Sequence, residues 1–208
     1  MGRARMLVLE PGADASAALA EWARVLRSGG VVAFATDTVW GLGALARDAA
    51  AIARIFAMKG RDDQRPMACL IRDAAMARGL APTWGEPVDL LARRYWPGAL
   101  TVVVDLGEPR LPAQRGLSTL GLRVPDRRAV LDLLDLLGEP LAATSANRSG
   151  QAELGSAADV MAELGDEVDL IVDDRSPVGG IASTVVEWNG SGWRVLRHGG
   201  LTLDESTR

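Results

Sequence analysis

Helical and strand-like segments alternate along nearly the whole sequence, and this alternation constrains the fold more than any other feature. In residues 14–30, Leu19, Trp22 and Leu26 recur at helical spacing and two glycines follow, which is typical of a helix with a defined end. The same reasoning predicts helices at 14–30, 49–60, 88–96, 126–138 and 157–165, and strands at 6–10, 31–36, 67–71, 100–106, 118–125, 140–144 and 168–174. Such alternation predicts an α/β layer structure with helices packed on a sheet.

The end of the sequence adds an antiparallel element. The turn sequence Asn-Gly-Ser-Gly lies between two apolar runs within 183–198, which is typical of a β-hairpin. A mixed sheet is therefore predicted rather than a purely parallel one. Segment 37–48 is interpreted as a loop, and Asp126 as the residue that opens the helix at 126–138. Because no repeat, low-complexity run or Ser/Pro-rich linker divides the chain, we expect a single domain over 1–208.

Composition excludes several classes of protein. Apolar residues make up 48% of the 208 residues, which is enough to fill a core and excludes a disordered chain. The formal net charge of -4 argues against a surface that grips nucleic acid throughout. The single cysteine, Cys69, allows neither an intrachain disulfide nor a thiolate metal cluster. No stretch approaches the ~20 apolar residues of a membrane span, and no signal peptide is visible, so we expect a soluble cytoplasmic protein.

A short basic connection follows the second expected helix. It places Lys59, Arg61 and Arg65 beside Asp62 and Asp63. In a non-helical stretch, Lys59 and Arg61 can point to the same side, where their charges would repel unless an anion joins them. Taken alone, the cluster is better interpreted as a solvated turn in which the two aspartates offset the cations.

Two further segments carry side chains suited to anionic ligands. Thr144, Ser145 and Asn147 follow an apolar strand directly, where hydroxyl and amide groups can wrap phosphate oxygens or a ribose, although an ordinary turn has the same composition. Arg123 lies inside an otherwise apolar strand, and a half-buried guanidinium requires a carboxylate or phosphate partner. A structural salt bridge would satisfy Arg123 equally well.

Two other segments suggest the walls of a pocket. Thr36 and Thr38 occupy alternating positions after a buried strand, so both hydroxyls can face one pocket, with Trp40 as an apolar wall. The alternative is that these threonines reflect β-propensity alone. Ser183 follows Gly179 and Gly180, where the backbone can approach a ligand closely or simply form a flexible turn.

Taken together and in this order, these segments resemble the YrdC/Sua5 family of threonylcarbamoyl-AMP synthases across almost the whole chain. The matching motifs are TDTVWGLG at 36–43, Lys59-Gly-Arg61, LRVP at 122–125, Ser145-Ala-Asn147, and STVVEW…VLRHG ending at 199. The resemblance implies a twisted mixed sheet with flanking helices around a large concave cavity. It also implies a reaction that joins L-threonine, bicarbonate and ATP into threonylcarbamoyl-adenylate and releases pyrophosphate. That product would feed tRNA modification through a downstream threonylcarbamoyl transferase.

The resemblance also implies roles for individual residues. Lys59 and Arg61 would be the catalytic residues, because adenylation requires the triphosphate to be neutralised and the leaving pyrophosphate to be stabilised. ATP would be held by Lys59, Arg61, Arg65, Thr119, Thr144, Ser145, Asn147 and Arg197, and threonine by Thr36, Thr38, Arg123 and Ser183. We expect no protein metal site, and Mg²⁺ would enter with ATP.

The sequence departs from the usual family pattern at three positions. Trp40 stands where a smaller aromatic residue is common, Arg65 where a small amide or other polar residue is common, and Leu70 where some members have a polar side chain. Two other functions stay open. One is a non-catalytic module that binds double-stranded RNA, with strongly salt-dependent affinity. The other is a related carbamoyl-adenylate enzyme with another acceptor.

Overall fold

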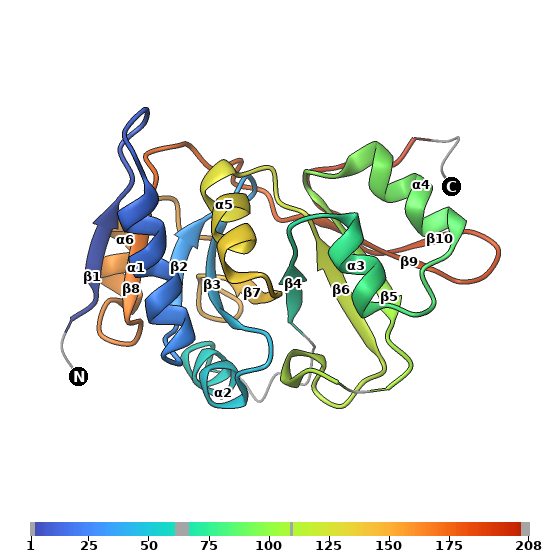
Figure 1. Cartoon of the computed structure of the whole chain (residues 1–208), viewed down its shortest axis with the longest axis horizontal. Coiled ribbons are helices and arrows are strands. Elements are labelled where there is room, and N and C mark those ends of the chain that lie inside the picture. The colour runs from blue at the N-terminus through green and yellow to red at the C-terminus, as the bar shows by residue number, and fades with distance from the viewer. Residues whose placement is uncertain (1–2, 61–66, 109, 205–208) are drawn as a thin grey trace.

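The computed structural model describes residues 3–60, 67–108 and 110–204 (Figure 1). Within these residues a single mixed sheet has the strand order β1-β8-β2-β3-β7-β4-β6-β5-β9-β10. The strands are β1 Arg5–Val8, β2 Val32–Ala35, β3 Trp40–Leu45, β4 Ala68–Leu70, β5 Leu100–Asp105, β6 Thr119–Arg123, β7 Leu141–Ser145, β8 Leu170–Asp173, β9 Thr184–Trp188 and β10 Trp193–Arg197. The α-helices are α1 Ser16–Arg27, α2 Ala49–Met58, α3 Ala74–Leu80, α4 Glu86–Tyr95, α5 Arg128–Leu137 and α6 Ala157–Leu164. The predicted α/β fold with a mixed sheet is confirmed.

The sheet combines parallel and antiparallel pairs. Strand β8 lies parallel to both β1 and β2, whereas β3 is antiparallel to both β2 and β7. The expected hairpin is present: β10 runs antiparallel to β9, with Trp193 opposite Trp188. Strand β9 joins the sheet by parallel pairing with β5, which places the hairpin at one end of the molecule (Figure 1).

The loop expected over 37–48 is wrong for its central part. Residues Trp40–Leu45 form strand β3, and all six are buried. Gly43 in this strand meets a packing requirement. A Cβ on Gly43 would lie 2.6 Å from Cε1 of Phe34, so only glycine lets the phenyl ring of β2 rest against β3. The strand therefore depends on a contact with its neighbour in the sheet.

Two helix predictions also need correction. Helix α3 was not predicted, although Asp73 accepts a hydrogen bond from the backbone N–H of Met76 and so provides a standard N-terminal cap. Helix α5 begins at Arg128, and its capping position is occupied by Arg127 instead of Asp126. The side chain of Arg127 makes no capping hydrogen bond, because a guanidinium has only donors and the first turn of a helix requires an acceptor. Its guanidinium donates instead to the segment that follows β8.

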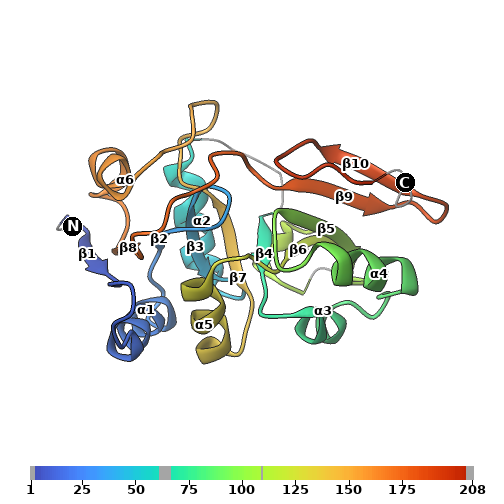
Figure 2. The ribbon, with the colours of Figure 1, turned by 90° about the horizontal axis from the view of Figure 1, so that it is seen from above.

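Helices cover both sides of the sheet. Figure 2 shows α1 and α5 on one side and α2 and α6 on the other. Alternation along β2 supplies both interfaces: Val32 and Phe34 belong to the core cluster under α1 and α5, and Ala33 and Ala35 to the cluster under α2 and α6. Among the described residues, no helix has the length and apolar character required to cross a bilayer.

Candidate active site

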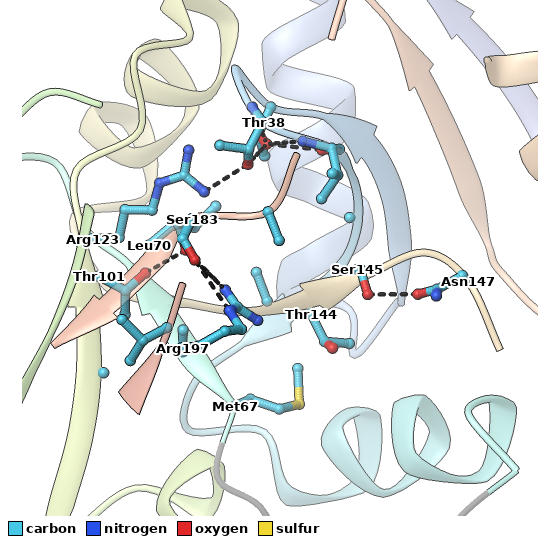
Figure 3. A pocket seen from close by; sticks show the side chains of 18 of the residues that line it. Thr38, Met67, Leu70, Thr101, Arg123, Thr144, Ser145, Asn147, Ser183 and Arg197 are labelled. Carbon is cyan, nitrogen blue, oxygen red and sulfur yellow. Dashed lines mark hydrogen bonds between the residues drawn. The ribbon is translucent and has the colours of Figure 1, made fainter. Parts of the chain in front are cut away.

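A cavity of about 520 Å³ lies against the sheet, and Figure 3 shows side chains that line it. Its lining comes from seven strands of the sheet, from the end of α2 and from the segments beside them. All five of the sequence segments with candidate ligand-binding residues contribute to this one cavity. The candidate residues that line it are Thr36, Thr38, Lys59, Arg123, Thr144, Ser145, Asn147, Ser183 and Arg197.

One described candidate residue does not line the cavity, and two other candidates lie outside the described residues. Thr119 is the first residue of β6; it shares a face of that strand with Gly121 and Arg123, both of which line the cavity, but does not line it itself. Arg61 and Arg65 lie outside the described residues. Their proposed contacts with ATP therefore stay predictions.

Lys59 anchors one end of the site. It follows α2 directly, and its Nζ donates hydrogen bonds to the carbonyl oxygen of Ser145 at 2.7 Å and to that of Asn147 at 2.5 Å. The same nitrogen lies 3.1 Å from Oδ1 of Asn147. Ser145 Oγ donates to this amide oxygen at 2.5 Å. An ammonium, a hydroxyl and an amide thus meet where β7 ends, which is an arrangement suited to anionic oxygen atoms.

Arg123 anchors the opposite end. It is only 6% exposed, and its guanidinium donates to Asp37 Oδ1 at 2.6 Å, to Thr38 Oγ1 at 2.8 Å and to the Gly98 carbonyl at 2.9 Å. Burial lowers the pKa of Arg123, and the Asp37 carboxylate opposes that effect. The sequence left open whether Arg123 pairs with a ligand anion or forms a structural salt bridge, and the structure shows a salt bridge with Asp37. The group is also in the cavity wall, so a salt bridge and a ligand contact are compatible.

Asp37 is a site residue that the sequence interpretation missed. It lies between Thr36 and Thr38, whose hydroxyl oxygens are 2.9 Å apart. The available signal was the arginine in an apolar strand, because a half-buried guanidinium requires an anionic partner and Asp37 lies between two candidate threonines. No local pattern links the two, since they are 86 residues apart in sequence.

Ser183 and Arg197 form a third group, shown in Figure 3. Arg197 donates from Nη2 to the carbonyl oxygen of Ser183 at 2.8 Å and to its Oγ at 3.1 Å. Ser183 Oγ also lies 2.8 Å from Thr101 Oγ1. Thr101 lines the cavity and is a second site residue that the sequence did not predict. Burial lowers the pKa of Arg197, with the Glu153 carboxylate acting in the opposite direction.

The cavity has a positive electrostatic character. Lys59, Arg123 and Arg197 line it, whereas no aspartate or glutamate occurs among its described lining residues. The charge of Arg197 contributes to the lowered pKa of Arg123, so the two guanidinium groups repel each other across the site. An anionic ligand placed between these cations would relieve that repulsion.

Some of the apolar side chains near the site line the cavity, and others pack in the core. Trp40 does not form the expected wall, because it is 4% exposed and packs in the core, while its neighbours Val39 and Gly41 line the cavity. Leu70 lines the cavity and is 3% exposed. Cys69 is fully buried in the core.

Within ranges 3–60, 67–108 and 110–204, no three or more histidine, cysteine, aspartate or glutamate side chains form a group that could hold a metal ion. The polar groups of the cavity are instead cations, hydroxyls and amides, which fit oxyanions.

Comparisons with known proteins agree with this geometry. The threonylcarbamoyl-AMP synthase of Pyrococcus abyssi is 38% identical over 182 residues, which cover 86% of this chain and 53% of that protein. The threonylcarbamoyl-AMP synthase of Chromohalobacter salexigens is 41% identical over 74% of this chain and 83% of its own length. The crystal structure of P. abyssi Sua5 complexed with L-threonine superposes with a TM-score of 0.88 at 34% identity, covering 95% of this chain and 58% of that one.

The chain thus spans about half the length of some of the curated relatives that it matches. The family model Sua5_yciO_yrdC, described as telomere recombination, matches residues 24–199. That match includes the segments that supply Thr36, Lys59, Arg123, Ser145 and Arg197 to the cavity. The chain therefore belongs to the Sua5/YciO/YrdC family.

Proposed function

We propose that this chain is an L-threonylcarbamoyladenylate synthase, a nucleotidyltransferase that uses L-threonine, bicarbonate and ATP and releases pyrophosphate. The observation that carries the proposal is the convergence of Lys59, Ser145, Asn147, Arg123 and Arg197 on one cavity of positive character. The names of the relatives support the same activity. We also propose that residues 1–208 act as one domain, since a single sheet connects the described strands.

The nucleotide is proposed to occupy the end of the cavity near Lys59. There Lys59, Ser145 and Asn147 present an ammonium, a hydroxyl and an amide from the junction of α2 and β7. Lys59 would neutralise phosphate charge once it exchanges carbonyl oxygens for phosphate oxygens. Mg²⁺ would enter as part of the nucleotide substrate. The further ATP contacts proposed are Arg61, Arg65, Thr119, Thr144 and Arg197.

Threonine is proposed to bind near Arg123. The guanidinium uses three of its five N–H groups for Asp37, Thr38 and the Gly98 carbonyl, and the others are available to the amino acid carboxylate. The hydroxyls of Thr36, Thr38 and Ser183 line the same region and suit the polar groups of threonine. Leu70 supplies an apolar wall for the threonine methyl group.

The chemistry follows from placing these two ligands side by side. Threonine's amino group and bicarbonate form an N-carboxylate with loss of water. An oxygen of this carbamate then attacks the α-phosphorus of ATP, and the bond to the pyrophosphate oxygen breaks. Because no nucleophile or base is needed from the protein, its contribution is to hold the reactants in line and to stabilise the charge on the leaving pyrophosphate.

The decisive experiment measures pyrophosphate release with each substrate omitted in turn. We expect release only when ATP, threonine and bicarbonate are all present, and a product whose mass corresponds to threonylcarbamoyl-adenylate. Replacing threonine by serine, valine or alanine tests the acceptor. Release that is independent of bicarbonate, or supported equally by all four amino acids, would contradict the proposed activity.

The cellular setting is proposed on the chemistry alone. A mixed anhydride of this kind is short-lived, so we infer that a downstream transferase consumes it for threonylcarbamoyladenosine in tRNA. ATP as co-substrate is consistent with a cytoplasmic location. Direct contact with tRNA or double-stranded RNA stays a prediction, and salt-dependent RNA binding without pyrophosphate release would identify the non-catalytic alternative.

A further inference from the structure

Arg127 is a buried cation that does not line the cavity. It is 7% exposed, and it occupies the capping position of α5 without capping that helix. Its guanidinium instead contacts residues 174–180, the segment that follows β8 and that we call the strap. Nη2 donates to Asp174 Oδ1 at 2.5 Å and to the Ser176 carbonyl at 2.7 Å, and Nη1 donates to the Pro177 carbonyl at 2.8 Å. Among the described residues, every hydrogen-bond acceptor of Arg127 therefore belongs to the strap.

The far end of the strap touches the proposed threonine site. The backbone N–H of Gly179 donates to the Asp37 carbonyl at 3.1 Å, and that of Gly180 donates to the Thr38 carbonyl at 2.7 Å. The approach is close, since a Cβ on Gly179 would lie 2.9 Å from the Asp37 carbonyl oxygen. Three residues after Gly180 the chain reaches Ser183 in the cavity wall. The strap thus supports the backbone of the segment from which Thr38 faces the cavity.

The same segment is held from its other side by Arg123. Arg123 bonds the side chains of Asp37 and Thr38, whereas the strap bonds their backbone carbonyls. The two arginines are four residues apart: Arg123 is the last residue of β6, and Arg127 directly precedes α5. The segment 37–38 is therefore clamped between two structures that each depend on one buried arginine.

Stability alone does not explain an arginine at position 127. Its Nε is buried and has no hydrogen-bond partner among the described residues, which costs stability. Buried ion pairs are in general weak contributors to stability compared with packed apolar side chains, but they fix one geometry firmly. The side chain of Asp174 is only 14% exposed, so its carboxylate keeps this buried position only while it is paired with Arg127.

We propose that Arg127 is a positioning residue for amino acid binding. It fixes the strap against the 37–38 segment and thereby orients the Thr38 hydroxyl and the Asp37 carboxylate that holds Arg123. This inference rests on the proposed function for the identity of the ligand. It predicts that loss of Arg127 impairs use of threonine far more than use of ATP, because Lys59, Ser145 and Asn147 lie outside the clamp.

The test compares Arg127→Met with Arg128→Met in pyrophosphate-release kinetics. Arg128 is the adjacent arginine, its side chain is 88% exposed and it pairs with Asp132 of its own helix, so it is a matched control. For Arg127→Met we expect the KM for threonine to rise about 10- to 100-fold, the range expected when a binding group is misplaced. The KM for ATP and kcat should change less than about threefold, and Arg128→Met should match the unaltered chain. Equal rises in both KM values, or no rise for threonine, would overturn the proposal.

Two further measurements cover other outcomes. Gly179→Ala disturbs the contact between the strap and Asp37 without altering the ion pair of Arg127 with Asp174, so it should also raise the KM for threonine selectively. If Arg127→Met does not fold, this variant tests whether the strap positions residues 37–38 for threonine binding. Hydrogen exchange at the Gly179 and Gly180 amides should become faster in Arg127→Met than in Arg128→Met. Exchange reports on the clamp even if the unaltered chain releases no pyrophosphate with threonine, and unchanged exchange would refute the clamp itself.

Discussion

Replacing Lys59 by methionine separates the proposed catalytic role of this side chain from its structural one. The change keeps an unbranched chain of similar length and removes the ammonium. In the structure that ammonium makes two short hydrogen bonds, to the carbonyl oxygens of Ser145 and Asn147. Each such bond contributes about 1 kcal/mol net, and the half-buried position of Lys59 places the total loss at about 1–2 kcal/mol. For a chain of this size that lowers Tm by roughly 2–8 °C.

The expected effect on the reaction is larger. Removing one donor that stabilises developing negative charge typically costs about 3–4 kcal/mol in the transition state, which is a factor of 10²–10³ in rate. Lys59→Met should therefore reduce pyrophosphate release by that factor while the protein stays folded at the assay temperature. Circular dichroism and thermal unfolding provide the control for the fold.

A chemical experiment reports on the same nitrogen directly. Lys59 is the only lysine in the 208-residue sequence, so an amine-selective reagent can modify only Lys59 and the terminal amine. We expect ATP to protect Lys59 from labelling and threonine alone to leave the labelling rate unchanged, as measured by peptide mass spectrometry. Full activity of Lys59→Met, or labelling of Lys59 that ATP does not slow, would refute the placement of the phosphates at this end of the cavity.

Three further substitutions or treatments have expected outcomes. Arg123→Ala should weaken threonine use more than ATP use and lower the free energy of unfolding by about 3–5 kcal/mol, because it leaves Asp37 unpaired; unchanged threonine dependence would count against this assignment. Trp22→Phe should lower the free energy of unfolding by less than about 2 kcal/mol in urea, although Trp22 is only 1% exposed. The reason is that its buried indole N–H has no hydrogen-bond partner among the described residues, so its removal costs little. A loss near the ~3–5 kcal/mol of a tryptophan truncation would contradict this reason. Burial raises the pKa of Cys69 from 9.0 to about 12. The folded chain should therefore resist thiol reagents at pH 8 and react once denatured, and its free energy of unfolding should fall as the pH rises above about 9. Rapid labelling of the native chain would contradict the burial.

Most elements of the fold were predictable because they depend on local periodicity. Helix α2 and strand β5 have apolar residues at the spacing that their own geometry requires, so a window of ten residues is enough to identify each. Strand β3 was not recognised because Gly43 makes room for Phe34, a residue of another strand. Propensity treats glycine as a break in a strand, and only the paired neighbour shows why it is needed.

The site was predictable in its cations and hydroxyls but not in their partners. Lys59, Ser145 and Arg123 were identified because their motifs resemble a family, and all three line the cavity. Asp37 and Thr101 were missed because each gains its role from a partner more than 80 residues away, Arg123 and Ser183 respectively. Trp40 was misplaced for a related reason: as part of β3, its side chain packs in the core instead of following the pocket.

The distribution of partners among the three cations indicates how the cavity is prepared for its ligands. Lys59 and Arg197 are held by neutral oxygen atoms, of Ser145 and Asn147 in one case and of Ser183 in the other. Arg123 donates to the Asp37 carboxylate, which compensates much of its charge. The proposed threonine end therefore relies on geometry more than on net charge, as the binding of a small zwitterion requires. It is the end at which the strap and Arg127 matter, because the strap holds the backbone carbonyls of Asp37 and Thr38.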